Sequence, residues 1–414
     1  MNLLRSISVT CKKIPGIFRV LIGIICFTII VPLIANDQPL YISNDSAFGF
    51  PALNPHGSAV INLNNSEIII IYQQIDWKSD TLFNKIFALI PWSPNKTDVL
   101  NANYIGPASN NYRLNQNGNK LLLTGSERHL LGTSKRGEDV FSGLLHGSRV
   151  SISVGLFSML ITGFIGIFLG AMAGFFGDDK LKLSSATLFT SAILAIPFWF
   201  YCIQLSSEYD SKFYSVLVCS SFILIFIGLK KFLNRFEYYK RSVSIPADLI
   251  ILKLIEILAS MPRLILIIVI AAVITPSVQS LILIIGLTSW TEIARITRAE
   301  MLSAKGYDYI EAARAQGTGD MRLIFKHAIP NIISPAIVVL VFGISGAIMT
   351  ESGLSFLGIG VPQDVVTWGS LLAAGKEHFQ AWWLIIFPGL ALFGTIYFFN
   401  SLGEYMQRVL VKGR

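Results

Sequence analysis

Long apolar runs separated by short polar segments dominate the chain. A membrane-spanning helix needs about 20 consecutive, mostly apolar residues, and eight stretches approach this length. These runs are Ile14–Ala35, Val150–Gly177, Ala186–Leu205, Phe213–Leu229, Leu249–Thr275, Val278–Ile293, Ile332–Met349 and Trp382–Leu402. The fourth and sixth runs are short. The pattern predicts an all-α polytopic membrane protein with eight spans.

The first run has a second interpretation as a signal peptide. It follows basic residues and ends at Ala35, which is typical of such peptides. However, its apolar stretch is long for a signal peptide, and Leu33 is large where a small residue is preferred. We therefore favour a retained span.

The composition supports a membrane protein and excludes several other classes. Of the 414 residues, 53% are hydrophobic and only 14% are charged, whereas soluble domains carry about 25% charged residues. This argues against a soluble enzyme, a disordered chain and a nucleic-acid partner. The four cysteines form no CxxC motif and no disulfide framework.

The positions of the basic residues predict the orientation. Cytoplasmic loops of membrane proteins are enriched in Lys and Arg, and five segments of this chain hold most of those residues outside the long segment 36–146. They contain Arg5, Lys12 and Lys13; Lys180 and Lys182; Lys230, Lys231, Arg235, Lys240 and Arg241; Arg295, Arg298, Lys305, Arg314, Arg322 and Lys326; and Arg408, Lys412 and Arg414. Eight spans with both termini in the cytoplasm place every one of these segments on the cytoplasmic side.

The long segment 36–146 then lies outside the membrane. It contains a strand-like run, Glu67–Tyr72, and many Asn, Gly and Pro turn residues. We expect a small, partly β outer domain whose role the sequence leaves open. The predicted divisions are 1–35 (N-terminus and first span), 36–146 (outer segment), 147–182 (second span), 183–245 (a transmembrane hairpin and basic loop) and 246–414 (the core).

A polar segment between the sixth and seventh runs, Tyr307–Pro330, reads as helix, break, helix; we call it the elbow. Good helix formers fill its first part, and Gly317-Thr318-Gly319 interrupts them. Asp320 is expected to cap the second helix, and Pro330 to end it or to start the next span. An apolar stripe is expected from Met321, Ile324, Phe325 and Ala328. On this periodicity alone, the elbow reads as an interfacial helix lying on the membrane.

The residue types of the elbow indicate a more specific function than its periodicity does. Glu311-Ala312-Ala313, then Gly317, His327, Ile329 and Pro330 resemble the EAA loop of permease subunits of ATP-binding-cassette (ABC) importers. The resemblance implies that the elbow, within a coupling loop at 298–331, is a coupling helix docked in a groove of a cytosolic ATPase subunit. The implied coupling residues are Glu311, Ala312, Ala313, Arg314, Gly317, Asp320, His327 and Pro330.

Three other segments resemble the second permease of oligopeptide, dipeptide and nickel importers. The first is His129–Ser151, which departs from that family at Ser134, Glu138 and Gly143. The second is Glu256 followed by Pro262, with Lys253 placed to pair with Glu256. The third runs from Glu351 to Pro362 and suits a re-entrant or outer-gate element. Its candidate pathway or gate residues are Glu351, Ser355, Phe356, Gly358 and Gly360.

This resemblance implies a type I ABC importer fold of six core helices, to which Ala186–Leu205 and Phe213–Leu229 add an inserted hairpin. It also implies a second homologous permease, two cytosolic ATPase domains that use ATP and Mg, and an outer substrate-binding protein. The location implied is a bacterial inner membrane. Short peptides lead as substrate, while nickel complexes and other small solutes remain alternatives.

Several absences bear on the mechanism. The nearest approach to a phosphate-binding loop, Gly132–Gly137, is followed by two acidic residues, and the histidines show no metal-ligand spacing. We therefore expect no catalysis and no cofactor in this chain. A secondary transporter would need functional charges at mid-membrane depth, and an intramembrane protease would need paired catalytic groups within spans. These two classes are the alternatives.

Overall fold

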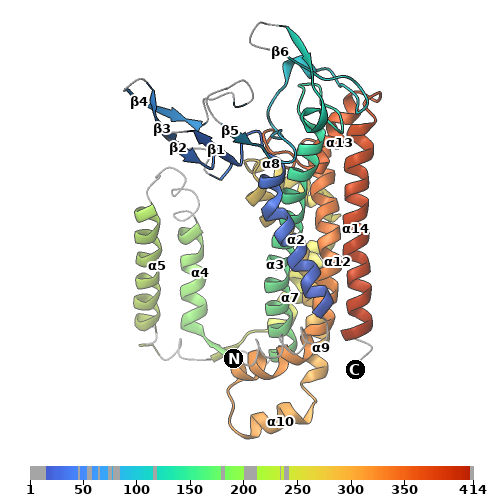
Figure 1. Ribbon diagram of the computed structural model, residues 1–414. Helices are drawn as coiled ribbons and strands as arrows, with labels where there is room; N and C mark the ends of the chain where they lie inside the picture. Colours follow the sequence, from blue (N-terminus) through green and yellow to red (C-terminus); the bar gives the residue numbers. More distant parts are fainter. Residues whose placement is uncertain are drawn as a thin grey trace.

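The computed structural model describes residues 15–44, 47–53, 58–63, 66–72, 77, 84–114, 119–178, 182–199, 212–233, 235–236 and 242–410. Within these residues the fold is a bundle of long helices with short strands at one end (Figure 1). The helices are α2 (Pro15–Ile34), α3 (Val140–Phe176), α4 (Ser185–Trp199), α5 (Lys212–Leu233), α7 (Ala247–Ala259), α8 (Arg263–Val273), α9 (Val278–Ala304), α10 (Asp308–Ala315), α11 (Asp320–Arg322), α12 (Ile329–Phe356), α13 (Trp368–Glu377) and α14 (Trp383–Leu410).

Helices lie at all eight apolar runs, but not every one has the length of a span. Among the described residues, the runs long and apolar enough to cross a membrane are Val140–Phe176, Val278–Ala304, Asp320–Phe356 and Trp383–Leu410. A fifth is added if α7 and α8 count as one span. The end of the third run and the terminal basic residues Arg5, Lys12, Lys13, Lys412 and Arg414 lie outside the described residues.

The fifth run, Leu249–Thr275, differs from the prediction because it is two helices and not one. α7 and α8 meet at a bend of 84°. Pro262 sits in the break and directly precedes α8. Proline has no N–H for a preceding turn and disfavours helical backbone in the residue before it, so the chain breaks here despite its continuous apolar character.

Helix α3 is the centre of the bundle and packs most extensively against α9. Gly166, Gly170 and Gly174, which follow one another at four-residue spacing on α3, allow this approach. A Cβ atom at Gly166 would lie 2.6 Å from Ile293 Cβ, and one at Gly174 would lie 2.8 Å from the Arg298 carbonyl oxygen. Small residues at four-residue spacing are a common way for membrane helices to pack closely. α3 and α9 are therefore tightly joined along their length.

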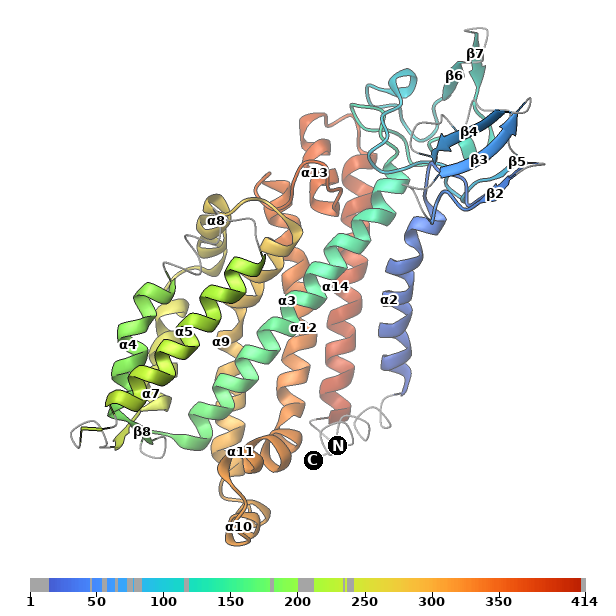
Figure 2. The ribbon, with the colours of Figure 1, turned by 90° about the vertical axis from the view of Figure 1, so that its left-hand side faces the viewer.

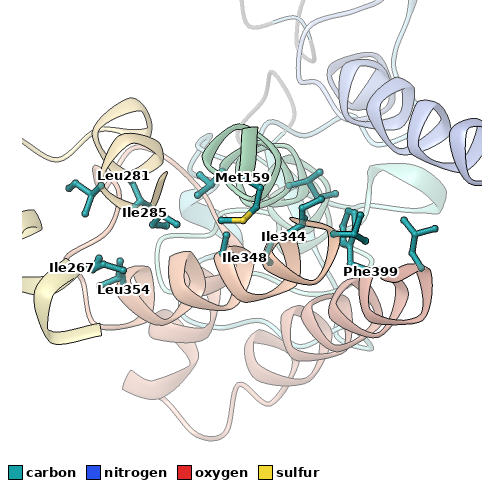
Figure 3. Close-up of a cluster of buried hydrophobic side chains, with 14 of the residues drawn as sticks. Met159, Ile267, Leu281, Ile285, Ile344, Ile348, Leu354 and Phe399 are labelled. Atoms are coloured by element: carbon teal, nitrogen blue, oxygen red, sulfur yellow. The ribbon is translucent and has the colours of Figure 1, made fainter. Parts of the chain in front are cut away.

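The main hydrophobic core lies where α3, α8, α9, α12 and α14 meet. Figure 3 shows part of this core and labels Met159, Ile267, Leu281, Ile285, Ile344, Ile348, Leu354 and Phe399. Trp368 of α13 also belongs to this core, so six helices share it.

Strands occupy the described parts of the segment between α2 and α3. β2 (Ala47–Gly49), β1 (Tyr41–Asn44) and β5 (Asn84–Ile86) form an antiparallel sheet in that order; β3 (Ser58–Leu63) pairs with β4 (Ser66–Ile71), and β6 (Tyr112–Leu114) with β7 (Lys120–Leu122). The strand-like run Glu67–Tyr72 thus coincides with β4. Figures 1 and 2 show these strands at the end of the bundle opposite α10.

Helices α4 and α5 pack against each other beside the bundle (Figure 1). Two short strands, β8 (Lys182–Ser184) and β9 (Ser242–Ser244), pair antiparallel at the base of this pair. In addition, Leu249 N donates to Asp178 Oδ1 over 3.0 Å. The chain therefore leaves the bundle after α3 and returns to the same place before α7.

Candidate functional site

The first half of the elbow is helix α10, which projects from the end of the bundle (Figure 2). Ile310 and Ala313 are buried, whereas Glu311, Ala312 and Arg314 are exposed. One face of α10 thus packs on the protein while the opposite face is free within the described chain.

Gly317 ends this helix with a left-handed backbone. Its φ is +78°, and a Cβ added there would meet nothing within 4 Å. The Thr318 N–H donates to the Ala313 carbonyl over 3.2 Å, which satisfies an end carbonyl of α10. The glycine is therefore required by its φ angle and not by lack of space within the chain.

The second half of the elbow corrects the predicted cap. Gly319 precedes α11, and no side chain caps that helix. Asp320 is instead the exposed first residue of α11, where a negative charge still favours the helix N-terminus. Pro330 is the second residue of α12, so it starts the span, in agreement with one of the two expectations.

The predicted apolar stripe is also wrong in part. Ile324 and Ala328 are buried, but Met321 and Phe325 are 50% and 40% exposed, and Leu323 is buried instead. Residues Leu323–Ala328 form a π-helical segment. Its i→i+5 hydrogen bonding places side chains differently from an α-helix, and such segments are frequent at functional sites.

The elbow is fixed to the helices above it by a cluster of buried apolar side chains. Its own members are Ile310, Ala313, Leu323, Ile324 and Ala328, and they pack with Phe175 and Phe176 of α3 and with Met301 and Ala304 of α9. The Arg314 guanidinium also lies 5.9 Å from the centre of the Phe175 ring. A displacement of the elbow is therefore transmitted to the ends of α3 and α9.

The opposite face of the elbow is open and partly aromatic. Tyr307 and Tyr309 are 53% and 39% exposed, and the candidate residues Glu311, Ala312 and Gly317 are exposed beside them. His327 is half-buried, and its carbonyl accepts a hydrogen bond of 2.8 Å from Asn331 Nδ2. The structure thus separates the predicted residues into an anchored set and an exposed set.

At the other end of α12, Glu351 is completely buried. Its carboxylate accepts hydrogen bonds from Ser151 Oγ at 2.6 Å, Ser355 Oγ at 2.8 Å and Ser352 Oγ at 3.2 Å. Thr367, which precedes α13, lies close to this carboxylate as well. We call these five residues the Glu351 cluster. It ties α3, α12 and the start of α13 together, so in this structure Glu351 lines no open cavity.

The remaining candidate gate residues lie beside this cluster. Gly358 has a φ of +78° and ends α12, with its N–H donating to the Ser355 carbonyl over 3.0 Å. A Cβ at Gly360 would lie 2.8 Å from Ser355 Oγ. The Lys376 ammonium of α13 lies 5.0 Å from the centre of the Phe356 ring. The structure therefore gathers all five candidates at the strand end of the bundle.

An ion pair that the sequence analysis missed joins α7 to α9. Arg298 donates two hydrogen bonds to Asp248, one of them from Nη2 to Oδ2 over 2.6 Å. The predicted pairing of Lys253 with Glu256 is confirmed at 2.7 Å, but both side chains are 62% exposed. Bidentate Arg–carboxylate pairs are the stronger kind, so the Asp248–Arg298 pair holds the elbow end of α7 in place.

The segment before α3 contains a buried histidine between two carboxylates. His129 Nδ1 lies 2.9 Å from Asp139 Oδ1, and Nε2 lies 3.4 Å from Asp98 Oδ2. Burial by itself lowers the pKa of His129, but the hydrogen bonds and charges of Asp139 and Asp98 outweigh it and hold the pKa above its ordinary value. Asp139 also caps α3 by accepting from Ser142 N.

Two of the three departures in this segment contact each other. Ser134 Oγ donates to Glu138 Oε2 over 2.8 Å, and the Glu138 N–H donates to Ser134 Oγ over 3.2 Å. The Trp383 indole N–H of α14 donates to the neighbouring Thr133 carbonyl over 3.1 Å. These bonds make the segment a packed connector between the strand end and the bundle.

The long apolar helices define a multi-pass membrane protein, and the elbow and the Glu351 cluster place its two polar sites at opposite ends. Residues 239–413 match the family described as "Binding-protein-dependent transport system inner membrane component". This match covers the part of the chain from β9 to the end of α14, which includes the elbow and the Glu351 side of the Glu351 cluster.

The chain is similar to several curated permeases. It is 28% identical over 287 residues to the di/tripeptide transport system permease DppC of Pseudomonas aeruginosa, which covers 69% of this chain and 73% of that one. It is 28% identical over 302 residues to the dipeptide permease DppC of Haemophilus influenzae, with 71% and 80% covered. It is 26% identical over 391 residues to the inner membrane ABC transporter permease YejE of Escherichia coli, with 94% and 90% covered.

A search of solved structures finds a chain of the MetNI methionine ABC transporter in inward-facing conformations. It matches with a TM-score of 0.40 and 12% identity over 64% of this chain and 96% of that one.

Proposed function

We propose that this protein is the second, C-type permease of an ABC importer and that the importer takes up short peptides. The peptide assignment is supported by the di/tripeptide and dipeptide permeases among its relatives. A second permease completes the substrate pathway, two cytosolic ATPase domains supply the driving force, and an outer binding protein delivers the substrate.

The burial and exposure of the elbow residues are the main support for this proposal. Its inner face is buried against α3 and α9, and its outer face exposes Glu311, Ala312 and Gly317. Small residues on the exposed face suit close packing in a groove of the ATPase, and Glu311 is placed to meet a basic residue there. Arg314, Asp320, His327 and Pro330 shape or border this surface.

ATP-driven closure of the ATPases then moves the elbow as a rigid body. Because the elbow shares one apolar cluster with the ends of α3 and α9, both helices move with it. The close contact of α3 with α9 through Gly166 and Gly174 keeps the two helices together. The pathway thereby changes from inward-open to outward-open.

The other end of the bundle is proposed as the outer gate. The Glu351 cluster joins α3, α12 and α13 at this end, and Ser355, Phe356, Gly358 and Gly360 shape the turn that follows α12. Movement of α3 against α12 has to break the Ser151–Glu351 bond, so the cluster holds the gate in the conformation seen here.

The arrangement in the membrane follows from the same assignment. We place the elbow and both termini in the cytoplasm and the strand end, with 36–146 as a small outer domain, on the far side of an inner membrane. α4 and α5 are the inserted hairpin of 183–245, which faces lipid or the partner permease, and eight spans result. The core with the coupling loop is 246–414.

The coupling assignment is tested by replacing Glu311 with Lys in the full importer. We expect loss of ATPase co-purification and of peptide uptake, since the variant reverses a charge on the exposed face without touching the buried cluster. Glu404→Lys is the matched control, because Glu404 is also exposed, near the same end of the bundle but on α14. Normal assembly and uptake in the Glu311 variant would overturn the assignment.

A further inference from the structure

Arg263 and Glu292 carry opposite charges on the apolar helices α8 and α9, and neither residue has a role in the proposed coupling to the ATPase. Arg263 is the first residue of α8, directly after the 84° break, and Glu292 lies on α9, against which α8 packs. The two charges are close enough to interact electrostatically. The described part of the structure shows no hydrogen bond or ion pair of 4 Å or less for either side chain.

Their depth places them inside the membrane. Arg298, which pairs with Asp248 near the elbow end, marks the cytoplasmic side of α9. Glu292 precedes it by six residues, which at the helical rise is about 9 Å further into the bundle. Arg263 follows the 13 residues of α7, which span about 20 Å.

Both residues are exposed on the surface of the chain, among apolar neighbours. Leu264 and Ile265, which follow Arg263, are 52% and 57% exposed. Charged side chains that face lipid are costly, and ionisable residues within spans almost always face a bundle interior or a water-filled cavity. This surface of α8 and α9 therefore faces the pathway and not lipid.

We propose that Arg263 and Glu292 line the substrate pathway and bind the carboxylate and the ammonium ends of the transported peptide. This rests on the proposed peptide function. One cationic side chain at the break between α7 and α8 and one anionic side chain on the adjacent α9 match the two charges of a short zwitterionic peptide. Within the described residues neither charge has a hydrogen-bonding or ion-pair partner, so each is available to the substrate.

The first experiment asks whether the two positions face an aqueous pathway. The four native cysteines are replaced with Ser, and Arg263→Cys, Glu292→Cys and Leu390→Cys are made one at a time in the complete importer. We expect a charged, water-soluble thiol reagent to modify positions 263 and 292, with trialanine slowing the reaction during ATP turnover. Leu390, exposed on α14 and remote from α8, is the control and should stay unmodified. No modification at either position would overturn the pathway assignment.

The second experiment asks what the charges bind, using trialanine uptake by the complete importer in proteoliposomes. Arg263→Gln and Glu292→Gln should each raise the KM about tenfold, the size expected for one charged hydrogen bond, while Arg263→Lys retains most uptake. The control pair Glu404→Gln and Arg408→Gln removes a surface ion pair on α14 and should leave the KM unchanged.

A charge exchange separates substrate contact from a merely structural pair. If the two residues serve only each other, Arg263→Glu combined with Glu292→Arg restores the wild-type KM, and that result would overturn the proposal. If each holds one end of the peptide, the exchange stays defective while ATPase co-purification remains normal. A wild-type importer that fails to take up trialanine contradicts the peptide function itself, and the thiol experiment still decides whether the pair faces the pathway.

Discussion

The left-handed backbone at Gly317 gives the most specific prediction. A glycine can be required either by its φ angle or by lack of space for a Cβ atom, and the structure distinguishes these two reasons. Its φ of +78° penalises any Cβ-bearing residue, and nothing in the chain lies within 4 Å of an added Cβ. For Ala in this conformation the cost is about 1–2 kcal/mol, which lowers the population of the docked elbow about 5- to 30-fold. Asn tolerates the left-handed region better, so Gly317→Asn should be milder than Gly317→Ala.

Gly319 supplies the matched control. It lies two residues away, is exposed, has an ordinary φ of −66°, and also has no neighbour within 4 Å of an added Cβ. Gly319→Ala should therefore leave ATPase affinity unchanged or slightly improve it by restricting the unfolded chain.

The assay is the affinity of the purified permease complex for its ATPase subunit, measured by titration in detergent, together with uptake. The expected order of affinity is wild type, then Asn, then Ala at position 317. If Asn is worse than Ala, bulk against the partner and not the φ angle explains the glycine. Equal effects of Gly317→Ala and Gly319→Ala would refute the reasoning.

Three further predictions concern stability, each read from thermal or denaturant unfolding of the purified permease. Glu351→Ala should lower the free energy of unfolding by about 2–4 kcal/mol, because it leaves buried hydroxyls without an acceptor and creates a cavity. Glu351→Gln keeps an acceptor and should lower it less. Arg298→Lys keeps the charge but loses the bidentate bond to Asp248 and should cost about 1–2 kcal/mol. The raised pKa of His129 means that its contribution is complete below the ordinary pKa and is lost as pH rises through the folded pKa, so His129→Gln should abolish this alkaline loss.

Specific outcomes contradict each of these predictions. Equal destabilisation by Gln and Ala at position 351 would mean that hydrogen bonding to the carboxylate contributes nothing. An Arg298→Lys variant as stable as wild type would reduce the pair to simple charge attraction. A wild-type protein whose stability is flat from about pH 6 to 9 would show that His129 does not titrate in this range.

Local patterns in the sequence predicted the elbow well, and its misplacements have physical reasons. Gly317 was found because a left-handed helix end favours glycine whatever lies around it. The apolar stripe was misplaced because it assumes a regular α-helix, whereas Leu323–Ala328 is π-helical. The cap was misplaced by one residue, because the helix already begins at Asp320 and Gly319 takes the cap position. A π-helical segment depends on how the helix is packed, so the periodicity of the sequence does not predict it.

The break between α7 and α8 is a second feature that the sequence pattern did not predict. Pro262 was visible in the sequence, but a run averaged for apolar character passes through it as one span. The packing of α8 onto α9 and the core decides that the chain turns by 84° after this proline. The same turn brings Arg263 near enough to Glu292 for the two charges to interact.

By itself, the sequence determined the class of this protein, because spans, basic loops and the elbow depend on composition and short-range spacing, which the membrane and the backbone impose locally. The tertiary structure alone decided which polar groups meet. Ser151 and Glu351 are 200 residues apart, and Asp248 and Arg298 are 50 apart. Such pairs form only where helices pack, so their physical cause is the geometry of the bundle.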